Sequence, residues 1–229
     1  MALTSNASPG SAAIPALRFA VTDAEAVVHS ALPTISFRLA IDALGAAAIR
    51  SILLDVQIQI AARARGYDDA EQERLLELFG GVERWGTTLR TLPWVRTTAI
   101  VPPFNGSTTI ALTVPCSYDL EVSGARYLAA LATGDVPLEF LFSGSVFFAG
   151  AAGMLQTTRI SWNHEVSYGL PVAVWRQAID RHFPGSAWLR LRRESFERLC
   201  AYKARHAFTD WDAAVEALLA VAEEERLGG

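Results

Sequence analysis

The chain has 229 residues and a formal net charge of −4 at pH 7, and 51% of its residues are hydrophobic while 19% are charged. General nucleic-acid binding needs a basic surface that neutralises phosphates, so this composition argues against that class of partner. An average domain carries about 25% charged residues. The shortfall predicts apolar surface that a protein partner or a second copy of the chain covers.

Residues 1–16 are small and polar, and we expect them to form a disordered tail. They lack the basic and apolar regions of a secretory signal peptide. Cys116 and Cys200 follow no disulfide or metal spacing, which suits a reducing compartment, so we expect a cytoplasmic protein. Ser143-Gly144 interrupts the uncharged stretch 140–155, and we therefore expect no membrane span.

Alternation of apolar and polar residues predicts the first strands. Leu17–Val28 is the first, and Ile35–Asp42 and Leu54–Ile60 follow with the period of two that is typical of a half-buried strand. The residues between the second and third strands contain Gly45 and supply a turn. We therefore expect these two strands to pair as an antiparallel hairpin.

A helix is predicted over Tyr67–Phe79. Asp68 with Glu71 forms a capping pattern at its start, and Gly80-Gly81 ends it. A loop that contains Trp85, Trp94 and several prolines is expected to follow, with strand-like pieces between these residues.

More strands and a short helix are predicted in the middle of the chain. Thr109–Cys116 alternates, and the pattern continues past Pro115 through Tyr118, Leu120 and Val122. Arg126–Ala132 suits a short helix. Strands are predicted over Val136–Phe148, with a kink at Ser143-Gly144, and over Gln156–Trp162.

The last third is predicted to be helical. Apolar residues recur at helical spacing over Pro171–Phe183, Arg193–Ala204 and Asp210–Arg226. Thr209 with Asp212 resembles a capping box that opens the last of these helices. We expect the apolar stripe of that helix to face inward, and it comprises Trp211, Val215, Leu218 and Leu219.

Strands followed by helices, without β-α-β alternation, predict an α+β fold. We expect a mainly antiparallel β-sheet or sandwich with a helical C-terminal segment. Residues 17–229 are expected to form a single domain, mainly β over 17–168 and helical over 169–229.

No pattern in the sequence points to a metal, a cofactor or a catalytic residue. The four histidines have no metal-ligand spacing, and Ser143-Gly144-Ser145 lacks the sequence of a nucleophile elbow. One enzymatic alternative stays open. A hydrolase-like site would form if folding brought Ser145 to His164 and Glu165.

Two groups of residues are candidates for contacts with a partner. Trp85 and Trp94 lie in the proline-containing loop, where aromatic side chains offer a large contact area, although such residues also fold back on their own domain. Arg190, Arg192 and Arg193 form a compact basic cluster. The cluster either receives an acidic partner or is a solvated face.

Several strings from Gly134 onward are distinctive, and they are Gly134–Gly144 (GDVPLEFLFSG), Ile160–Trp162 (ISW), Leu170–Trp175 (LPVAVW) and Phe183–Trp188 (FPGSAW). In them the chain resembles an uncharacterised family from high-GC Gram-positive bacteria (actinobacteria), over most of its length except the tail. Members of that family are identified near nickel–iron hydrogenase genes. The resemblance implies an accessory or assembly role for such a redox enzyme, and it assigns no activity, cofactor or catalytic residue.

Together these features favour a non-catalytic binding or assembly protein. One alternative is a homo-oligomeric structural protein whose apolar surface is its own interface. The other is an enzyme whose site follows no recognisable motif. A protein partner or self-association is expected in either non-catalytic case.

Overall fold

A computed structural model describes residues 14–45, 48–116, 122–150, 153–186 and 190–227. The chain divides into two compact units, Met1–Ala187 and Trp188–Gly229, and each is described here by itself. The single domain expected over residues 17–229 stays a prediction. Most of the predicted tail lies outside the described residues, and its last residue, Ala16, already belongs to the first strand.

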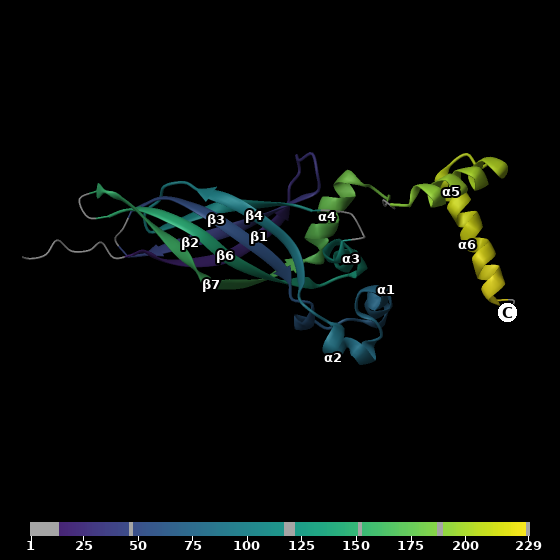
Figure 1. Cartoon of the computed structure of the whole chain (residues 1–229), viewed down its shortest axis with the longest axis horizontal. Helices are drawn as coiled ribbons and strands as arrows, with labels where there is room; N and C mark the ends of the chain where they lie inside the picture. Colours follow the sequence, from purple (N-terminus) through teal and green to yellow (C-terminus); the bar gives the residue numbers. More distant parts are fainter. Residues whose placement is uncertain (1–13, 46–47, 117–121, 151–152, 187–189, 228–229) are drawn as a thin grey trace, which may run out of the picture. The chain divides into compact units, whose positions relative to one another are not determined.

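The first unit contains two antiparallel sheets (Figure 1). Sheet A has the order β1-β2-β5, and its strands are β1 (Ala16–Ala26), β2 (Thr34–Leu44) and β5 (Ser107–Pro115). Sheet B has the order β4-β3-β6-β7, and its strands are β4 (Leu92–Val101), β3 (Ile49–Ile60), β6 (Asp135–Ala149) and β7 (Leu155–Pro171). These antiparallel sheets, with helices after them in the chain, confirm the predicted α+β class.

The core lies between the two sheets. The alternating residues of β2 and β3 that point inward are fully buried, and they are Ile35, Phe37, Leu39 and Ile41 of β2 and Ile52, Leu54, Val56, Ile58 and Ile60 of β3. Phe19 of sheet A stacks on Phe142 of sheet B with 4.4 Å between ring centroids. Full burial of one such side chain stabilises the fold by about 1.5–3 kcal/mol, so these faces dominate its stability.

The predicted hairpin between β2 and β3 is wrong. β2 pairs with β1 and β5, whereas β3 pairs with β4 and β6. Leu44 therefore ends a strand of sheet A, and Ile49 begins a strand of sheet B. Alternation shows that a strand buries one face, but it does not identify the neighbouring strands.

Helix α1 (Asp69–Phe79) ends at the predicted residue, has the predicted cap Asp68, and begins two residues after the predicted Tyr67. The Asp68 carboxylate accepts a hydrogen bond from the Glu71 amide at 2.7 Å, and the Gly80 amide donates to the Leu76 carbonyl. The Glu71 side chain does not complete a reciprocal capping box. It is buried and accepts from the Ala132 amide and from Arg65 instead.

The segment predicted as a tryptophan-containing loop has regular structure in large part. Within it, short helices cover Val82–Arg84 (η2) and Trp85–Thr88 (α2), and Trp94 lies on β4. Another short helix, Ala62–Ala64 (η1), lies between β3 and α1. Helix α3 (Ser123–Ala130) lies near the predicted Arg126–Ala132. The predicted continuation through Tyr118 and Leu120 lies outside the described residues, and Val122 is not part of a strand.

Strand β7 has 17 residues and extends well beyond the predicted Gln156–Trp162. Helix α4 (Val172–His182) begins directly after it, belongs to the first unit and contacts β1, β2 and β7, with Val172, Trp175 and Ile179 buried in the core. The remaining helices, α5 (Arg193–Arg205) and α6 (Trp211–Leu227), belong to the second unit. The predicted helical segment is therefore divided between the units.

The predicted kink in β6 is present at Gly144. The register with β7 shifts between Phe142 and Gly144, and Gly144 has a φ of 139°. A Cβ atom at this position would lie 2.0 Å from the Leu53 carbonyl oxygen. Only glycine therefore allows β3 and β6 to approach each other here.

Replacement of Gly144 by alanine is expected to lower the free energy of unfolding by about 2–4 kcal/mol, because a strained backbone and an overpacked contact add together. The control is Gly106→Ala, where φ is also positive (69°) but no atom lies within 4 Å of the added Cβ. Its expected cost is about 1 kcal/mol. Equal losses in urea unfolding would contradict the steric role of Gly144.

Candidate functional site

Trp85 is held against its own unit. Its Nε1 donates to the Gly80 carbonyl at 2.9 Å, and its ring lies edge-on to Tyr67 and Phe79 with centroid distances of 5.2 and 6.2 Å. The side chain is half-buried. These contacts give Trp85 a role in joining α2 to α1.

Trp94 is also half-buried, and it lies on β4. Its ring lies edge-on to Phe37 at 6.3 Å. Helix α3 passes close above it, because a Cβ atom on Gly124 would lie 3.2 Å from Cδ1 of Trp94. Both tryptophans therefore contribute to packing and leave only part of their surface to a partner.

The hydrolase-like arrangement does not form. Ser145 pairs with Arg159 across β6 and β7, whereas His164 lies opposite Phe142. At ~3.3 Å per strand residue, this register separates Ser145 from His164 by roughly 10 Å. The His164 ring packs edge-on against Phe19 at 5.4 Å, while Glu165, its neighbour on the strand, is exposed.

A polar network ties α1 and the end of α3 to the segment after β3. Glu71, which is 2% exposed, accepts from Nη2 of Arg65 at 2.9 and 3.1 Å and from the Ala132 amide at 3.0 Å. The Tyr67 and Tyr127 hydroxyls lie 2.8 Å apart, and burial raises the pKa of both phenols. The phenols therefore stay protonated, and the network has the character of a structural support.

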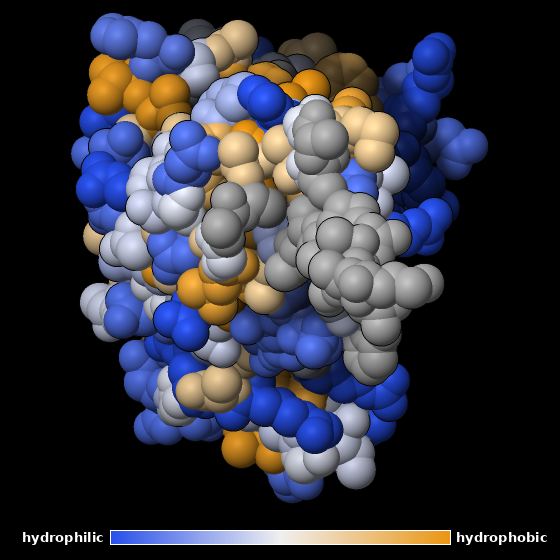
Figure 2. Space-filling model, turned by 90° about the vertical axis from the view of Figure 1, so that its left-hand side faces the viewer, coloured by the Kyte–Doolittle hydropathy of each residue, from blue (hydrophilic) through white to orange (hydrophobic). Residues whose placement is uncertain are grey.

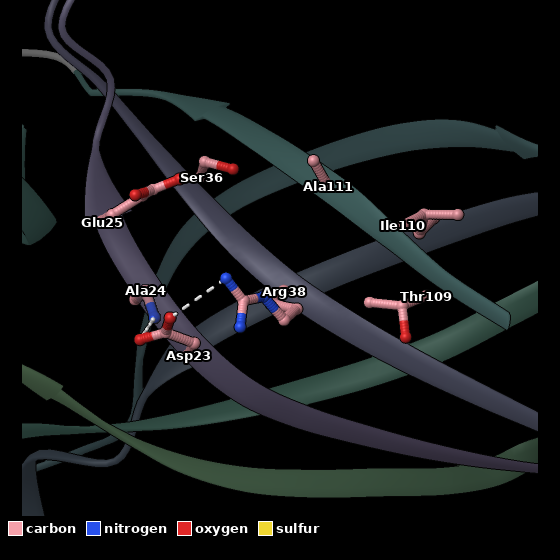
Figure 3. Close-up of a pocket in the computed structure, with 8 residues that line it drawn as sticks. All are labelled: Asp23, Ala24, Glu25, Ser36, Arg38, Thr109, Ile110 and Ala111. Atoms are coloured by element: carbon pink, nitrogen blue, oxygen red, sulfur yellow. Dashed lines mark hydrogen bonds and ion pairs between the residues drawn. The ribbon is translucent and has the colours of Figure 1, made fainter.

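Sheet A has a shallow hollow of about 210 Å³ on its outer face (Figure 3). The Arg38 guanidinium points toward Asp23 and forms an ion pair at 3.5 Å, while the Asp23 carboxylate also accepts from the Ala24 amide at 2.9 Å. Both charged side chains are more than half exposed. An exposed pair of this kind contributes about 0–1 kcal/mol and does not form a binding pocket.

A hollow of about 420 Å³ lies where β6 and β7 meet the segment after β3. Arg65, Asp135, Glu139, Ser167 and Tyr168 are among the residues that line it. It carries charges of both signs. Within the described ranges, no group of three or more His, Cys, Asp or Glu side chains could hold a metal ion.

The hydrophobic patches on the surface at one end of the two sheets are small. Figure 2 shows this end, where the hydrophobic residues lie in separate groups among hydrophilic ones. Leu44, Met154 and Leu155 are among the exposed large hydrophobic residues of this unit. None of the described helices is both long and apolar enough to cross a membrane.

The second unit has an ordered turn between α5 and α6. The Lys203 ammonium donates to the carbonyls of Phe208 and Thr209 at 2.8 and 3.0 Å and lies 5.5 Å from the centre of the Trp211 ring. The cap of α6 is Asp210, which accepts from the Ala213 amide at 2.8 Å, and not the predicted Thr209. This hydrogen bond lowers the pKa of Asp210.

The apolar side chains of this unit remain open to solvent. The prediction that the α6 stripe faces inward is wrong, since Trp211, Val215, Leu218 and Leu219 are 40–51% exposed. Among residues 190–226, Ala214 alone is buried. Two helices within roughly 40 residues offer each other too little surface to build a closed core.

The two helices carry opposite charge. Residues 190–205 contain six basic and two acidic residues, whereas α6 contains five acidic residues and one basic residue. Arg190, Arg192 and Arg193 are exposed at the start of α5. A hollow of about 420 Å³ between the helices is lined by residues of both, including Arg198, Tyr202, Arg205 and Leu218. We call the exposed apolar residues of this unit the helical surface, and they are Leu191, Phe196, Trp211, Val215, Leu218, Leu219 and Val221.

Replacement of Trp85 by alanine is expected to lower the free energy of unfolding by about 3 kcal/mol, because it removes the hydrogen bond to Gly80 and two ring contacts. The matched control is Trp211→Ala, at a side chain that is 42% exposed. Chemical denaturation followed by tryptophan fluorescence and circular dichroism compares the two. An unchanged midpoint for Trp85→Ala would show that Trp85 is free to serve a partner.

Comparison with known proteins identifies a family and no close relative. A model described as a family of unknown function (DUF6084) matches residues 14–227. No curated protein sequence matches the chain.

Two solved β-glucosidases show weak structural similarity. The enzyme 3B from Thermotoga neapolitana, in complex with α-D-glucose, has a TM-score of 0.25 and 12% identity over 68% of this chain. The enzyme from Kluyveromyces marxianus has a TM-score of 0.24 and 8% identity over 68% of this chain. The chain spans 17% and 15% of the lengths of these enzymes, and the similarity carries no functional argument.

Proposed function

This chain belongs to DUF6084, a family of unknown function, and we propose that it is a non-catalytic binding or assembly protein that docks through its C-terminal helical unit, Trp188–Gly229. The observation that supports this function is the exposure of the helical surface. Its seven large apolar side chains are between 39% and 51% exposed. Four of them lie along one stripe of α6, at Trp211, Val215, Leu218 and Leu219, and exposed apolar surface of this kind marks a site where another protein docks.

The sequence of α6 supports the same conclusion. Between Trp211 and Ala222 the only polar residues are Asp212 and Glu216. A helix that is apolar on nearly all sides belongs inside a folded structure, and α5 covers it only in part. An amphipathic or apolar helix that enters a groove of another protein is a recurring mode of recognition.

Three arginines next to the helical surface give it a positively charged side. Arg192 and Arg193 precede and begin α5 and are exposed, together with Arg190. We propose that these three residues form a basic rim that steers an acidic partner, since rim charges act mainly on the association rate. The parts of Trp85 and Trp94 that stay accessible are a secondary contact in this proposal.

We further propose that the partner is a redox enzyme such as a nickel–iron hydrogenase, in the cytoplasm of an actinobacterium, which this chain serves as an accessory protein. This identification rests on the family resemblance. The helical surface supports a protein partner of any identity, and the partner therefore needs its own experiment.

The test is a native co-purification with the variant Leu219→Glu. The control is Leu76→Glu, because Leu76 on α1 is 50% exposed and Leu219 is 51% exposed, so the same charge enters at equal exposure. We expect Leu219→Glu to reduce recovery of hydrogenase subunits or maturation factors by about 30-fold, the loss typical of an interface residue worth about 2 kcal/mol. Leu76→Glu should leave recovery unchanged.

The stability of both variants is measured in parallel. Surface substitutions change the free energy of unfolding by about 0.5 kcal/mol or less, and both variants should remain folded. Equal recovery from the two variants would contradict docking through the helical surface. A recovered partner at fixed stoichiometry that is not a redox enzyme would contradict only the identification of the partner.

A further inference from the structure

The two sheets have four edge strands, which are β1 and β5 in sheet A and β4 and β7 in sheet B. In natural proteins, charged residues, prolines or bulges on an edge strand prevent it from pairing with another chain. Strand β1 carries Arg18, Asp23 and Glu25 and a bulge, β4 carries Arg96 and Pro93, and β7 carries Arg159 and Glu165 and a bulge. These three strands are protected from pairing.

Strand β5 has no such protection along most of its length. From Ser107 to Val114 it contains no charged residue, and its only proline is the last residue, Pro115. Its register with β2 runs without a shift from Asp42 opposite Ser107 to Thr34 opposite Pro115. A straight, uncharged edge of this kind is a template for another strand.

The backbone groups that point away from β2 can be identified from the hydrogen bonds at the two ends of β5. The Ala43 amide donates to the Gly106 carbonyl, and the Cys116 amide donates to the Pro33 carbonyl. In an antiparallel pair the bonded residues alternate, so the even-numbered residues of β5 face β2. Thr109, Ala111 and Thr113 therefore direct their N–H and C=O groups outward.

These outward groups are accessible. All three residues are exposed, and within the described part of the chain β5 pairs with β2 alone. Unpaired backbone groups of an edge strand are satisfied by water or by an added strand.

The sequence of β5 is complementary to itself about Ala111. In an antiparallel arrangement with a two-fold axis at this residue, Ala111 lies opposite the partner's Ala111, and Thr109 lies opposite the partner's Thr113. On the inner face, Ile110 lies opposite the partner's Leu112. The residues that would exchange hydrogen bonds with the partner strand are Thr109, Ala111 and Thr113, whose N–H and C=O groups point away from β2. No like charges lie opposite each other in this arrangement.

We propose that β5 pairs with β5 of a second copy of this chain, antiparallel about a two-fold axis at Ala111, so that two three-stranded sheets join into one continuous sheet. The interface is isologous, because the same strand contributes from both copies. It is independent of the helical surface and of the proposed function.

The direct test is a cross-link at the axis. Opposite residues of a hydrogen-bonded antiparallel pair have Cα atoms about 5.5 Å apart, within the range that a disulfide spans. In a background with Cys200→Ser, we expect Ala111→Cys to form an intermolecular disulfide under a mild oxidant. The matched control Thr113→Cys should not, because it lies four residues away from its own copy, roughly 13 Å along the strand.

A second test uses charge. The variant with Thr109→Lys and Thr113→Lys places lysine opposite lysine in both outer pairs, whereas Thr109→Lys with Thr113→Glu places lysine opposite glutamate. We expect sedimentation equilibrium to show a dimer for the unmodified chain. The dimer dissociation constant should be at least tenfold lower for the Lys/Glu variant than for the Lys/Lys variant. Thermal unfolding of both variants confirms that they are folded.

Three outcomes would overturn the proposal. One is a monomeric mass of the unmodified chain at every concentration. Another is equal dissociation of the Lys/Lys and Lys/Glu variants. The third is a dimer that Leu219→Glu abolishes and that neither charge variant affects, since that dimer uses the helical surface. None of these results depends on whether a redox enzyme is recovered with the protein.

Discussion

The interior shared by the two sheets is the constraint on which the rest of the first unit depends. Strands β2 and β3 bury the whole of one face, and the aromatic contacts between Phe19 and Phe142 and between Phe37 and Phe140 join the sheets at ring-centroid distances of 4.4 and 5.1 Å. Because these faces must stay dry, the opposite faces carry the polar residues.

The connection between β3 and β4 is stabilised in a different way. Burial of Glu71 is compensated by Arg65 and by the Ala132 amide, so that α1 and the end of α3 share one charged anchor. Loss of either partner of such a pair costs about 3–5 kcal/mol, although a well-packed apolar replacement can be neutral. The network thus fixes the arrangement of short helices, more than it adds to total stability.

The sequence predicted local structure better than it predicted neighbours. The alternation of Ile35–Asp42 identified a strand and its buried face, but pairing with β1 and β5 depends on contacts distant in sequence. The capping of α1 by Asp68 was predictable because every atom involved lies within one turn. Trp85 and Trp94 could not be assigned to core or surface, since a side chain in a loop is buried only by elements whose positions the sequence does not show. In α6 the apolar stripe predicted that one face of the helix is buried, but no local pattern identifies the surface that buries it.

Lys203 is the chain's single lysine, and its ammonium group holds the turn between α5 and α6 through two carbonyls and the Trp211 ring. Apart from a free amino terminus, the chain therefore presents one primary amine to acylating reagents or enzymes. Acylation at Nζ would remove the positive charge and two of its three hydrogen-bond donors in one step. A single nitrogen atom therefore carries both side-chain hydrogen bonds to the carbonyls of this turn and is also its one site for acylation.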